Sequence, residues 1–185
     1  MTPPTLVRAE RAERAAATLA APGEVALRPA TARDVAGIVA LIAGYAAEQV
    51  MLPRTPESVL LALDDFVVAV DAHGTVLGCG ALKEYSPSLA EVSSLAVARA
   101  AHGRGLGRTI VARLERLARA RGIGELFALT LTPEFFGAVG YEVVDRARYP
   151  EKIRRDCLGC ARRAACREVC VARSVEVVEG IRVAA

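Results

Sequence analysis

Short apolar runs and amphipathic segments alternate along most of the chain. Runs rich in β-branched and other apolar residues predict strands at 25–28, 66–70, 75–82, 90–97, 126–131 and 141–144. Helical patterns begin at Thr31 and cover 55–63, 106–117 and, briefly, 132–136. The turn Asp-Ala-His-Gly at 71–74 joins two of the strands into a hairpin. Strands interleaved with helices in this order predict a mixed α/β domain.

The two longest helical patterns differ in where their apolar residues lie. The segment 35–47 is apolar on nearly every side, which predicts a helix buried all round. Thr31 and Asp34 have capping-box spacing before it. The helix over 106–117 instead has one apolar stripe, formed by Leu106, Ile110, Val111, Leu114 and Leu117. Arginines occupy its other sides, and Gly122 is expected to end it.

Length and composition agree with a packed domain: of 185 residues, 53% are hydrophobic and 24% are charged. This excludes a disordered or fibrous chain. The apolar stretch 35–47 is shorter than the ~20 residues that a bilayer crossing needs. The N-terminal residues lack the continuous apolar segment of a secretory signal, so we expect a cytoplasmic protein without a membrane span. The net charge of +3 is too small to indicate a nucleic-acid partner.

Three parts are expected along the chain. Residues 1–23 form an extension rich in Ala and Arg, 24–178 form the folded domain, and 179–185 form a tail. The domain includes a cysteine-rich segment at 157–170.

A glycine-rich loop, His-Gly-Arg-Gly-Leu-Gly at 102–107, joins the predicted strand 90–97 to the amphipathic helix. Glycines let the main chain approach a ligand closely, and backbone N–H groups at a helix N-terminus attract anions. Arg104 and Arg108 add positive charge, so the loop is a candidate phosphate site. The alternative is a tight turn in which glycine serves packing alone. The glycine order fits neither a Walker loop nor a Rossmann fingerprint.

Together with residues 94–97, this loop resembles the acetyl-CoA signature of the GNAT acetyltransferases, with His102 in place of the usual Arg or Gln. The resemblance implies the GNAT fold: a mixed, mostly antiparallel sheet flanked by helices, whose splayed central strands bind acetyl-CoA. Further segments resemble the short, free-standing N-acetylglutamate synthases, namely Leu-Pro-Arg-Thr at 52–55, Gly-Cys-Gly-Ala-Leu at 78–82, 90–97, Leu-Phe-Ala-Leu-Thr at 126–130 and Pro-Glu-Lys-Ile at 150–153. The implied reaction is acetylation of the α-amine of L-glutamate, the first step of arginine biosynthesis.

The resemblance also implies how acetyl-CoA is bound. A bulge in the strand 90–97 interrupts the regular side-chain alternation and splays this strand from the next one. The backbone N–H of Leu95 polarises the thioester carbonyl, and main-chain groups of Ala96 and Val97 bind the pantetheine amides. The loop residues that bind the pyrophosphate are His102, Gly103, Arg104, Gly105, Leu106, Gly107 and Arg108.

Transfer to an amino acid needs a base, because its amine is mostly protonated at neutral pH. Glu91 matches the glutamate assigned as base in similar synthases; the alternative is a solvated carboxylate at a strand edge. Ser94 is a candidate donor to the leaving thiolate, with packing as the alternative. Many GNAT enzymes use a tyrosine for that step where this chain has Phe136, and Tyr141 is expected in the core.

The two carboxylates of glutamate call for cationic partners. Arg54 matches an arginine that binds the substrate carboxylate in the family, Lys152 is a second candidate, and Lys83 is a third. The alternative for each is a solvated surface cation. Another small amine or a protein amino group is the alternative acceptor within this fold. A homodimer is expected from the family alone.

Four cysteines, Cys157, Cys160, Cys166 and Cys170, have the spacing C-x2-C-x5-C-x3-C. They are candidate ligands of a structural zinc ion, with free thiols, an iron–sulfur cluster or a disulfide as alternatives. The segment 146–173 has nine basic and three acidic residues. This charge leaves open a non-catalytic module that binds acyl-CoA, nucleic acid or protein, although the segment has almost no aromatic residues for stacking on bases.

Overall fold

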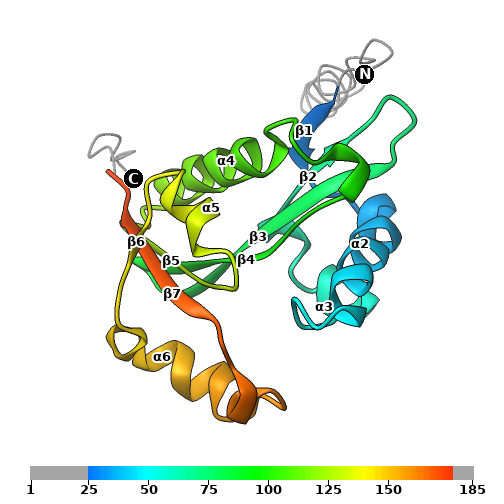
Figure 1. The fold of residues 1–185 in the computed structure, drawn as a ribbon. Helices are drawn as coiled ribbons and strands as arrows, with labels where there is room; N and C mark the ends of the chain where they lie inside the picture. Colours follow the sequence, from blue (N-terminus) through cyan, green and yellow to red (C-terminus); the bar gives the residue numbers. More distant parts are fainter. Residues whose placement is uncertain (1–24, 177–185) are drawn as a thin grey trace, which may run out of the picture.

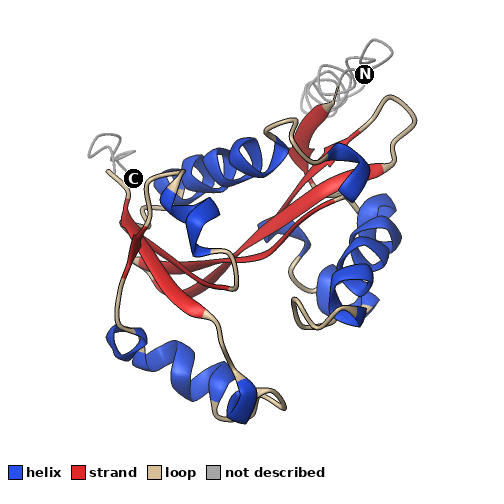
Figure 2. Cartoon of the chain, viewed as in Figure 1, coloured by secondary structure: helices blue, strands red, loops and turns tan. Residues whose placement is uncertain are grey.

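The computed structural model describes residues 25–176, which form a seven-stranded sheet with helices on both faces (Figures 1 and 2). The strands are β1 (Ala26–Pro29), β2 (Phe66–Val70), β3 (Val76–Ser86), β4 (Leu89–Val97), β5 (Glu125–Thr130), β6 (Glu142–Val143) and β7 (Val169–Ser174). The α-helices are α2 (Val35–Ala47), α3 (Pro56–Leu60), α4 (Leu106–Ala120), α5 (Pro133–Gly137) and α6 (Pro150–Lys152), the last continuing as a π-helical turn over Ile153–Cys157. The predicted extension 1–23 and tail 179–185 lie outside the described residues. Among residues 25–176, no helix is long and apolar enough to cross a membrane.

The strands are arranged in the order β1-β2-β3-β4-β5-β7-β6. Neighbouring strands pair antiparallel except β4 and β5, which are parallel. α4 and α5 cover one face, and α2 and α3 cover the other (Figure 1). Because helices cover both faces, every residue of β2 is buried. The predicted fold class, a mixed α/β sheet flanked by helices, is confirmed.

A bulge in β4 sets the geometry at the centre of the sheet. Ser94 and Leu95 together oppose Gly80 of β3, and Ser94 adopts a left-handed backbone conformation with φ of 52°. The extra residue reverses the side-chain alternation, so Val92 packs towards α4 and Ala96 towards α2. The predicted bulge is confirmed, and regular alternation along this strand does not hold.

The central strands β4 and β5 diverge just before the bulge. β4 pairs with β5 only at 89–91, opposite 125–127, whereas β5 pairs with β7 along its whole length. The sheet therefore opens between the second half of β4 and the end of β5, as the predicted splayed strands require.

The prediction that α2 is buried all round is wrong. Within this helix, the buried residues are Val35, Ile38 and Ile42, which lie on one face. The exposed positions are all alanine or glycine. These residues have little apolar surface, so leaving them in water costs little free energy. The predicted capping contact is present, because the Asp34 carboxylate accepts from the backbone N–H of Thr31 at 2.7 Å.

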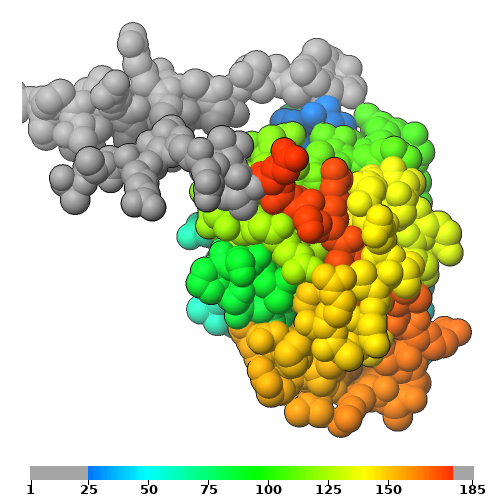
Figure 3. Space-filling model, turned by 90° about the vertical axis from the view of Figure 1, so that its left-hand side faces the viewer, coloured from blue at the N-terminus to red at the C-terminus, as the bar shows by residue number. Residues whose placement is uncertain are grey.

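The sequence pattern did not predict β7, which lies between β5 and β6. The segment that leads into it, 146–166, packs on the face of β5 opposite α4 and forms the lowest part of the molecule in Figure 3. Tyr149 anchors this segment by stacking on Phe127, with 4.2 Å between ring centroids. The segment thereby covers one end of the opening between β4 and β5.

Candidate active site

A cavity of about 1180 Å³ occupies the opening between β4 and β5. Its walls are β4 from Glu91 to Val97, the end of β5, the glycine loop with the first turn of α4, and the segment 146–166. Glu91 and Val97 are six residues apart along the strand, about 20 Å. The cavity therefore has two distinct ends, one at the glycine loop and one at Glu91.

The glycine loop has the backbone conformation that brings main-chain groups to the cavity. Gly103 and Gly105 have φ of 75° and 76°, the left-handed region that favours glycine, and Gly105 is the N-cap of α4. Gly107 is required for space, because a Cβ there would lie 3.1 Å from the ring of Phe135. The first N–H groups of α4 can therefore face an anion in the cavity.

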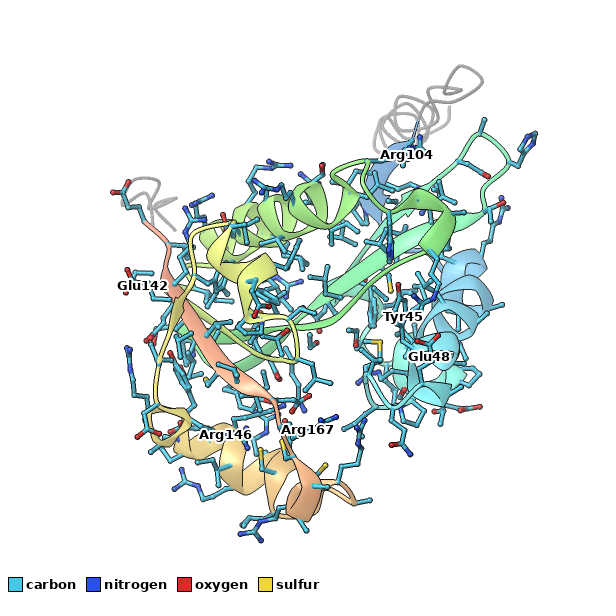
Figure 4. The ribbon with its side chains drawn as sticks, in the orientation of Figure 1. Tyr45, Glu48, Arg104, Glu142, Arg146 and Arg167 are labelled. Atoms are coloured by element: carbon cyan, nitrogen blue, oxygen red, sulfur yellow. The ribbon has the colours of Figure 1, made fainter. Side chains whose placement is uncertain are left out.

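His102 turns back towards β4. Its Nε2 lies 2.9 Å from the carbonyl oxygen of Val97 and 2.9 Å from the Tyr45 hydroxyl, and Tyr45 itself donates to that carbonyl at 2.6 Å. Figure 4 shows Tyr45 on α2, below Arg104 at the start of α4. Arg108 lines the cavity, so cationic side chains near the loop come from Arg104 and Arg108.

The main chain of β4 presents alternate residues to the cavity. The N–H of Ala98 donates to the carbonyl of Leu77 at 2.8 Å, so the main-chain groups of Ala98 and, by alternation, Ala96 face β3. Those of Leu95 and Val97 face away from β3, into the opening. Main-chain groups for a thioester and a pantetheine chain are thus available at Leu95 and Val97, whereas those of Ala96 belong to the ladder with β3.

At the other end of the cavity, Glu91 belongs to a compact charged cluster with Lys83, Tyr85, Lys152 and Asp156. Oε2 of Glu91 accepts from the Tyr85 hydroxyl at 2.9 Å and from Lys152 Nζ at 2.8 Å. Asp156 accepts from Lys83 at 2.6 Å, from Lys152 at 3.1 Å and from the Tyr85 hydroxyl. Glu91 is only 5% exposed. The predicted base and two of the predicted substrate cations therefore lie in one hydrogen-bonded group.

The charges in this cluster stabilise one another. Burial alone would raise the pKa of Asp156, but hydrogen bonds from Lys83 and Tyr85 and the charge of Lys152 lower it to about 2. Burial likewise disfavours the charge of Lys152, yet the carboxylates of Glu91 and Asp156 hold its pKa above the usual value. Burial, and then the negative charges of Glu91 and Asp156, raise the pKa of Tyr85, so its hydroxyl remains protonated.

Arg54 lies beside this cluster without an ion pair to any described residue. Its Nη2 donates to the Ser58 carbonyl at 3.1 Å, its guanidinium lies 5.8 Å from the centroid of the Phe66 ring, and its buried Nε has no hydrogen-bond partner among the described residues. It lines both the main cavity and an adjoining cavity of about 340 Å³. An anion that enters the cavity can therefore accept a hydrogen bond from the guanidinium group of Arg54.

The structure does not form the predicted zinc site. Among residues 25–176, no group of three or more His, Cys, Asp or Glu side chains is placed to hold a metal ion. Cys170 is buried in β7 beside Phe127 and Tyr149, because its strand position directs it into the sheet core. Cys157, Cys160 and Cys166 precede that strand and line the cavity as free thiols, and both Nη atoms of Arg146 lie 3.6 Å from Cys166 Sγ. Cys79 is buried, as expected.

Several residues of the site are not evident from local sequence patterns. Tyr85 lies beyond residue 82, the predicted end of its strand, because β3 continues to Ser86. Two of the partners of Asp156, Lys83 and Tyr85, are more than 70 residues away in the sequence. Thr130, at the end of β5, lines the wall opposite β4, and its hydroxyl lies 3.2 Å from that of Thr132. The only advance signal for Asp156 was its i,i+4 spacing from Lys152.

The remaining sequence predictions for the site concern Ser94, Phe136 and Tyr141. Ser94 lies at the bulge and lines the cavity. Phe136 and Tyr141 are buried and pack edge to face, with 5.2 Å between ring centroids. The core position expected for Tyr141 is therefore confirmed.

Comparison with known proteins agrees with this geometry. The model of the acetyltransferase (GNAT) family matches residues 41–141. An uncharacterized N-acetyltransferase of Chlorobaculum tepidum is 37% identical over 152 residues, which are 82% of this chain and 97% of that protein. The amino-acid acetyltransferase of Mycobacterium tuberculosis is 35% identical over 121 residues, covering 64% of this chain and 69% of that protein. The chain therefore belongs to the GNAT family, and it is an acetyltransferase.

Solved structures give the same result. The N-acetylglutamate synthase of Neisseria gonorrhoeae, complexed with coenzyme A and N-acetyl-glutamate, superposes with a TM-score of 0.74 at 28% identity. The match covers 83% of this chain but 35% of that one, so the chain spans about a third of that synthase. A Mycobacterium tuberculosis protein in complex with CoA matches with a TM-score of 0.70 at 28% identity, over 82% of this chain and 99% of that one. The predicted GNAT fold and enzyme class are confirmed.

Proposed function

We propose that this protein transfers the acetyl group of acetyl-CoA to the α-amine of L-glutamate, as an N-acetylglutamate synthase at the start of arginine biosynthesis. The observation that carries the proposal is the two-ended cavity: a glycine loop at the N-terminus of α4 lies at one end and a buried carboxylate with cations at the other. The names of the amino-acid acetyltransferase relatives and of the solved synthase support the same acceptor class.

In this proposal, acetyl-CoA lies along β4. The N–H groups of the loop 102–107 receive the pyrophosphate, with Arg104 and Arg108 as countercharges. The outward main-chain groups of Leu95 and Val97 receive the thioester and pantetheine. The carbonyl of Val97 holds the Tyr45 hydroxyl, so a pantetheine amide would share or replace that bond.

Glu91 is the proposed base for the ammonium group of the acceptor. Its Oε2 is engaged by Tyr85 and Lys152, and no hydrogen bond from a described residue reaches Oε1. Glu91 also lines the cavity, so Oε1 is the oxygen that can take the proton. The free amine then attacks the thioester carbonyl, the C–N bond forms and the C–S bond breaks. The second proton that the nitrogen loses on becoming an amide balances the proton that the departing CoA thiolate takes up.

Two hydroxyl groups are candidate proton donors to that thiolate. Ser94 lies on the β4 wall and Thr130 on the β5 wall of the same cavity. Arg54 is proposed to bind an acceptor carboxylate because it makes no ion pair with a residue in 25–176. Lys152 and Lys83 are proposed to assist, although both must share their charge with Asp156.

The first test is CoA release from acetyl-CoA with single amino acids, using a lysine-containing peptide as control acceptor. Turnover with glutamate supports the proposal, and turnover only with the peptide would replace it with a protein acetyltransferase.

Glu91→Gln is expected to lower kcat/KM at neutral pH by about 100-fold or more without weakening CoA binding. Glu142→Gln, which removes an exposed carboxylate on β6, should leave both unchanged. An unaltered pH profile in Glu91→Gln would remove Glu91 as base.

A further inference from the structure

The Tyr85 hydroxyl lies between two carboxylates. It is within hydrogen-bond distance of Glu91 Oε2, at 2.9 Å, and of Asp156 Oδ2. Tyr85 comes from β3, Glu91 from β4 and Asp156 from the π-helical turn after α6, so tertiary structure alone brings them together. A π-helical turn is an uncommon element that occurs frequently at functional sites.

A count of hydrogen atoms shows what this arrangement lacks. A tyrosine hydroxyl has one hydrogen to donate, and an ionised carboxylate has none. With both carboxylates ionised, Tyr85 can therefore satisfy Asp156 or Glu91 but not both, and one close pair of oxygens has no hydrogen between them. With one proton added to Glu91, its O–H donates to the Tyr85 oxygen while Tyr85 donates to Asp156. A single proton on one of the two carboxylates therefore places a hydrogen between each close pair of oxygens, which the fully ionised form cannot do.

We propose that Tyr85 and Asp156 are positioning residues that hold the proton which Glu91 removes from the acceptor amine. This inference rests on the proposed function, in which Glu91 is the base. The proton is taken at Oε1, which accepts no hydrogen bond from a described residue, and rotation about the two-fold Cγ–Cδ torsion of Glu91 carries the O–H to Tyr85. The transfer moves one proton from nitrogen to oxygen and requires no further reactant.

The surrounding charges explain why Glu91, and not Asp156, takes the proton. Asp156 is bound by both ammonium groups, Lys83 at 2.6 Å and Lys152 at 3.1 Å, which stabilise its ionised form. Glu91 is bound by Lys152 and is more deeply buried, at 6% side-chain exposure against 26% for Asp156. Neutralising Glu91 therefore costs less free energy than neutralising Asp156.

Two further titratable groups lie close to the pair. Arg155 lies 4.8 Å from the centroid of the Tyr85 ring, and the Cys170 thiol of β7 interacts electrostatically with Glu91. Replacing Tyr85 by phenylalanine leaves all of these charges in place. The change that this substitution causes in the titration of Glu91 therefore measures the contribution of the Tyr85 hydroxyl group alone.

The direction of the change in the Glu91 pKa tests the proposal. In the wild type, Tyr85 makes one hydrogen bond when Glu91 is ionised and two when it is protonated. Tyr85→Phe should therefore move the titration midpoint of Glu91 to lower pH, because the protonated form loses the additional hydrogen bond. A tyrosine that only donated to ionised Glu91 would have the opposite effect, so Tyr85→Phe would then raise the pKa.

The measurement is a ¹³C NMR titration of the side-chain carboxyl carbons in glutamate-labelled full-length protein, with the Glu91 signal identified from Glu91→Gln. Tyr149→Phe is the matched control, because the Tyr149 hydroxyl donates at 2.8 Å to Glu125, a residue outside the charged cluster. It should leave the Glu91 midpoint unchanged and raise that of Glu125. A Glu91 midpoint that rises or stays constant in Tyr85→Phe would overturn the proposal.

This titration needs no turnover, so its outcome is separate from that of the proposed function. Failure of glutamate acetylation with a lowered Glu91 midpoint in Tyr85→Phe would reject the acceptor and retain the proton-holding group. Glutamate acetylation with an unchanged Glu91 midpoint would retain the acceptor and reject the role of Tyr85 and Asp156 in holding the proton. In an active enzyme, the acid limb of the kcat/KM profile should also move to lower pH in Tyr85→Phe.

Discussion

At the scale of single residues, the acceptor end of the cavity is defined by which cations already have partners. Lys83 and Lys152 are bound to Asp156, and Lys152 is also bound to Glu91. Arg54 is held by a carbonyl and an aromatic ring, and its Nε is buried without a partner in the described part of the chain. A buried donor without a partner is unfavourable by about 1–3 kcal/mol. Binding of a carboxylate to Arg54 would recover part of that free energy.

Arg54→Ala should therefore raise the KM for a carboxylate acceptor by about 10- to 100-fold, the range expected for loss of a charge-assisted hydrogen bond. The KM for acetyl-CoA should change little, because its phosphates are proposed to bind at the glycine loop and not at Arg54. Steady-state kinetics with each substrate varied will measure both constants. Arg116→Ala, on the exposed side of α4, is the control for loss of a positive charge. An unchanged acceptor KM in Arg54→Ala would exclude the carboxylate role.

At the scale of elements, α4 begins and ends at glycines with the same conformation. Gly105 at the N-cap and Gly122 just after the C-terminus both have φ of 76°, and a Cβ at either would meet no atom within 4 Å. An alanine at either position would have to adopt the left-handed backbone conformation, which costs about 1 kcal/mol. Only Gly105 lines the cavity. The two positions therefore separate backbone strain from a role in binding.

Gly105→Ala and Gly122→Ala should reduce the free energy of unfolding by similar amounts, about 1 kcal/mol. Gly105→Ala should in addition weaken CoA binding, because the N–H groups at the start of α4 lose their alignment with the phosphates. Denaturant unfolding and calorimetric titration with CoA will measure the two effects. Equal CoA affinity in the two variants would mean that the loop conformation contributes nothing specific to binding.

At the scale of the whole molecule, the charged cluster joins the segment 146–166 to the rest of the sheet. Lys83 of β3 and Glu91 of β4 are bound to Asp156 and Lys152 of that segment, and Tyr149 stacks on Phe127 beside them. Folding lowers the pKa of Asp156 to about 2. Its ion pairs therefore contribute stability above the unfolded-state pKa, about 3.9. That contribution is lost as the pH falls towards 2.

Asp156→Asn should be less stable than the wild type at neutral pH by about 1 kcal/mol, a value reduced for partial solvent screening. The difference should shrink as the pH falls below about 4 and vanish below about pH 2, where the folded wild-type carboxyl group gains its proton. Urea unfolding at a series of pH values will show this. Asp64→Asn, which alters an exposed carboxylate without an ion pair in the described structure, should follow the wild-type curve. A stability difference that persisted unchanged into acid would refute the linkage.

Local patterns in the sequence determined most elements and the cofactor end of the cavity. The 3.6-residue stripe of α4, the apolar strands and the turn at 71–74 each depend on neighbours within a few residues. The loop 102–107 belongs to the same class, because a strand, a glycine turn and a helix N-terminus are contiguous in the chain. Burial of α2 was wrongly predicted because apolar composition does not distinguish small exposed alanines from core residues.

Only the tertiary structure decided the acceptor end of the cavity. β7 inserts between β5 and β6, and the segment before it brings Lys152 and Asp156 to Tyr85 and Glu91 across more than 60 residues of sequence. Such contacts leave no periodic signal, because each partner alone looks like an ordinary surface charge. The same packing places Cys170 in the core and the other three cysteines of its segment at the cavity wall. The sequence spacing suggested one metal site, but strand direction separated its ligands.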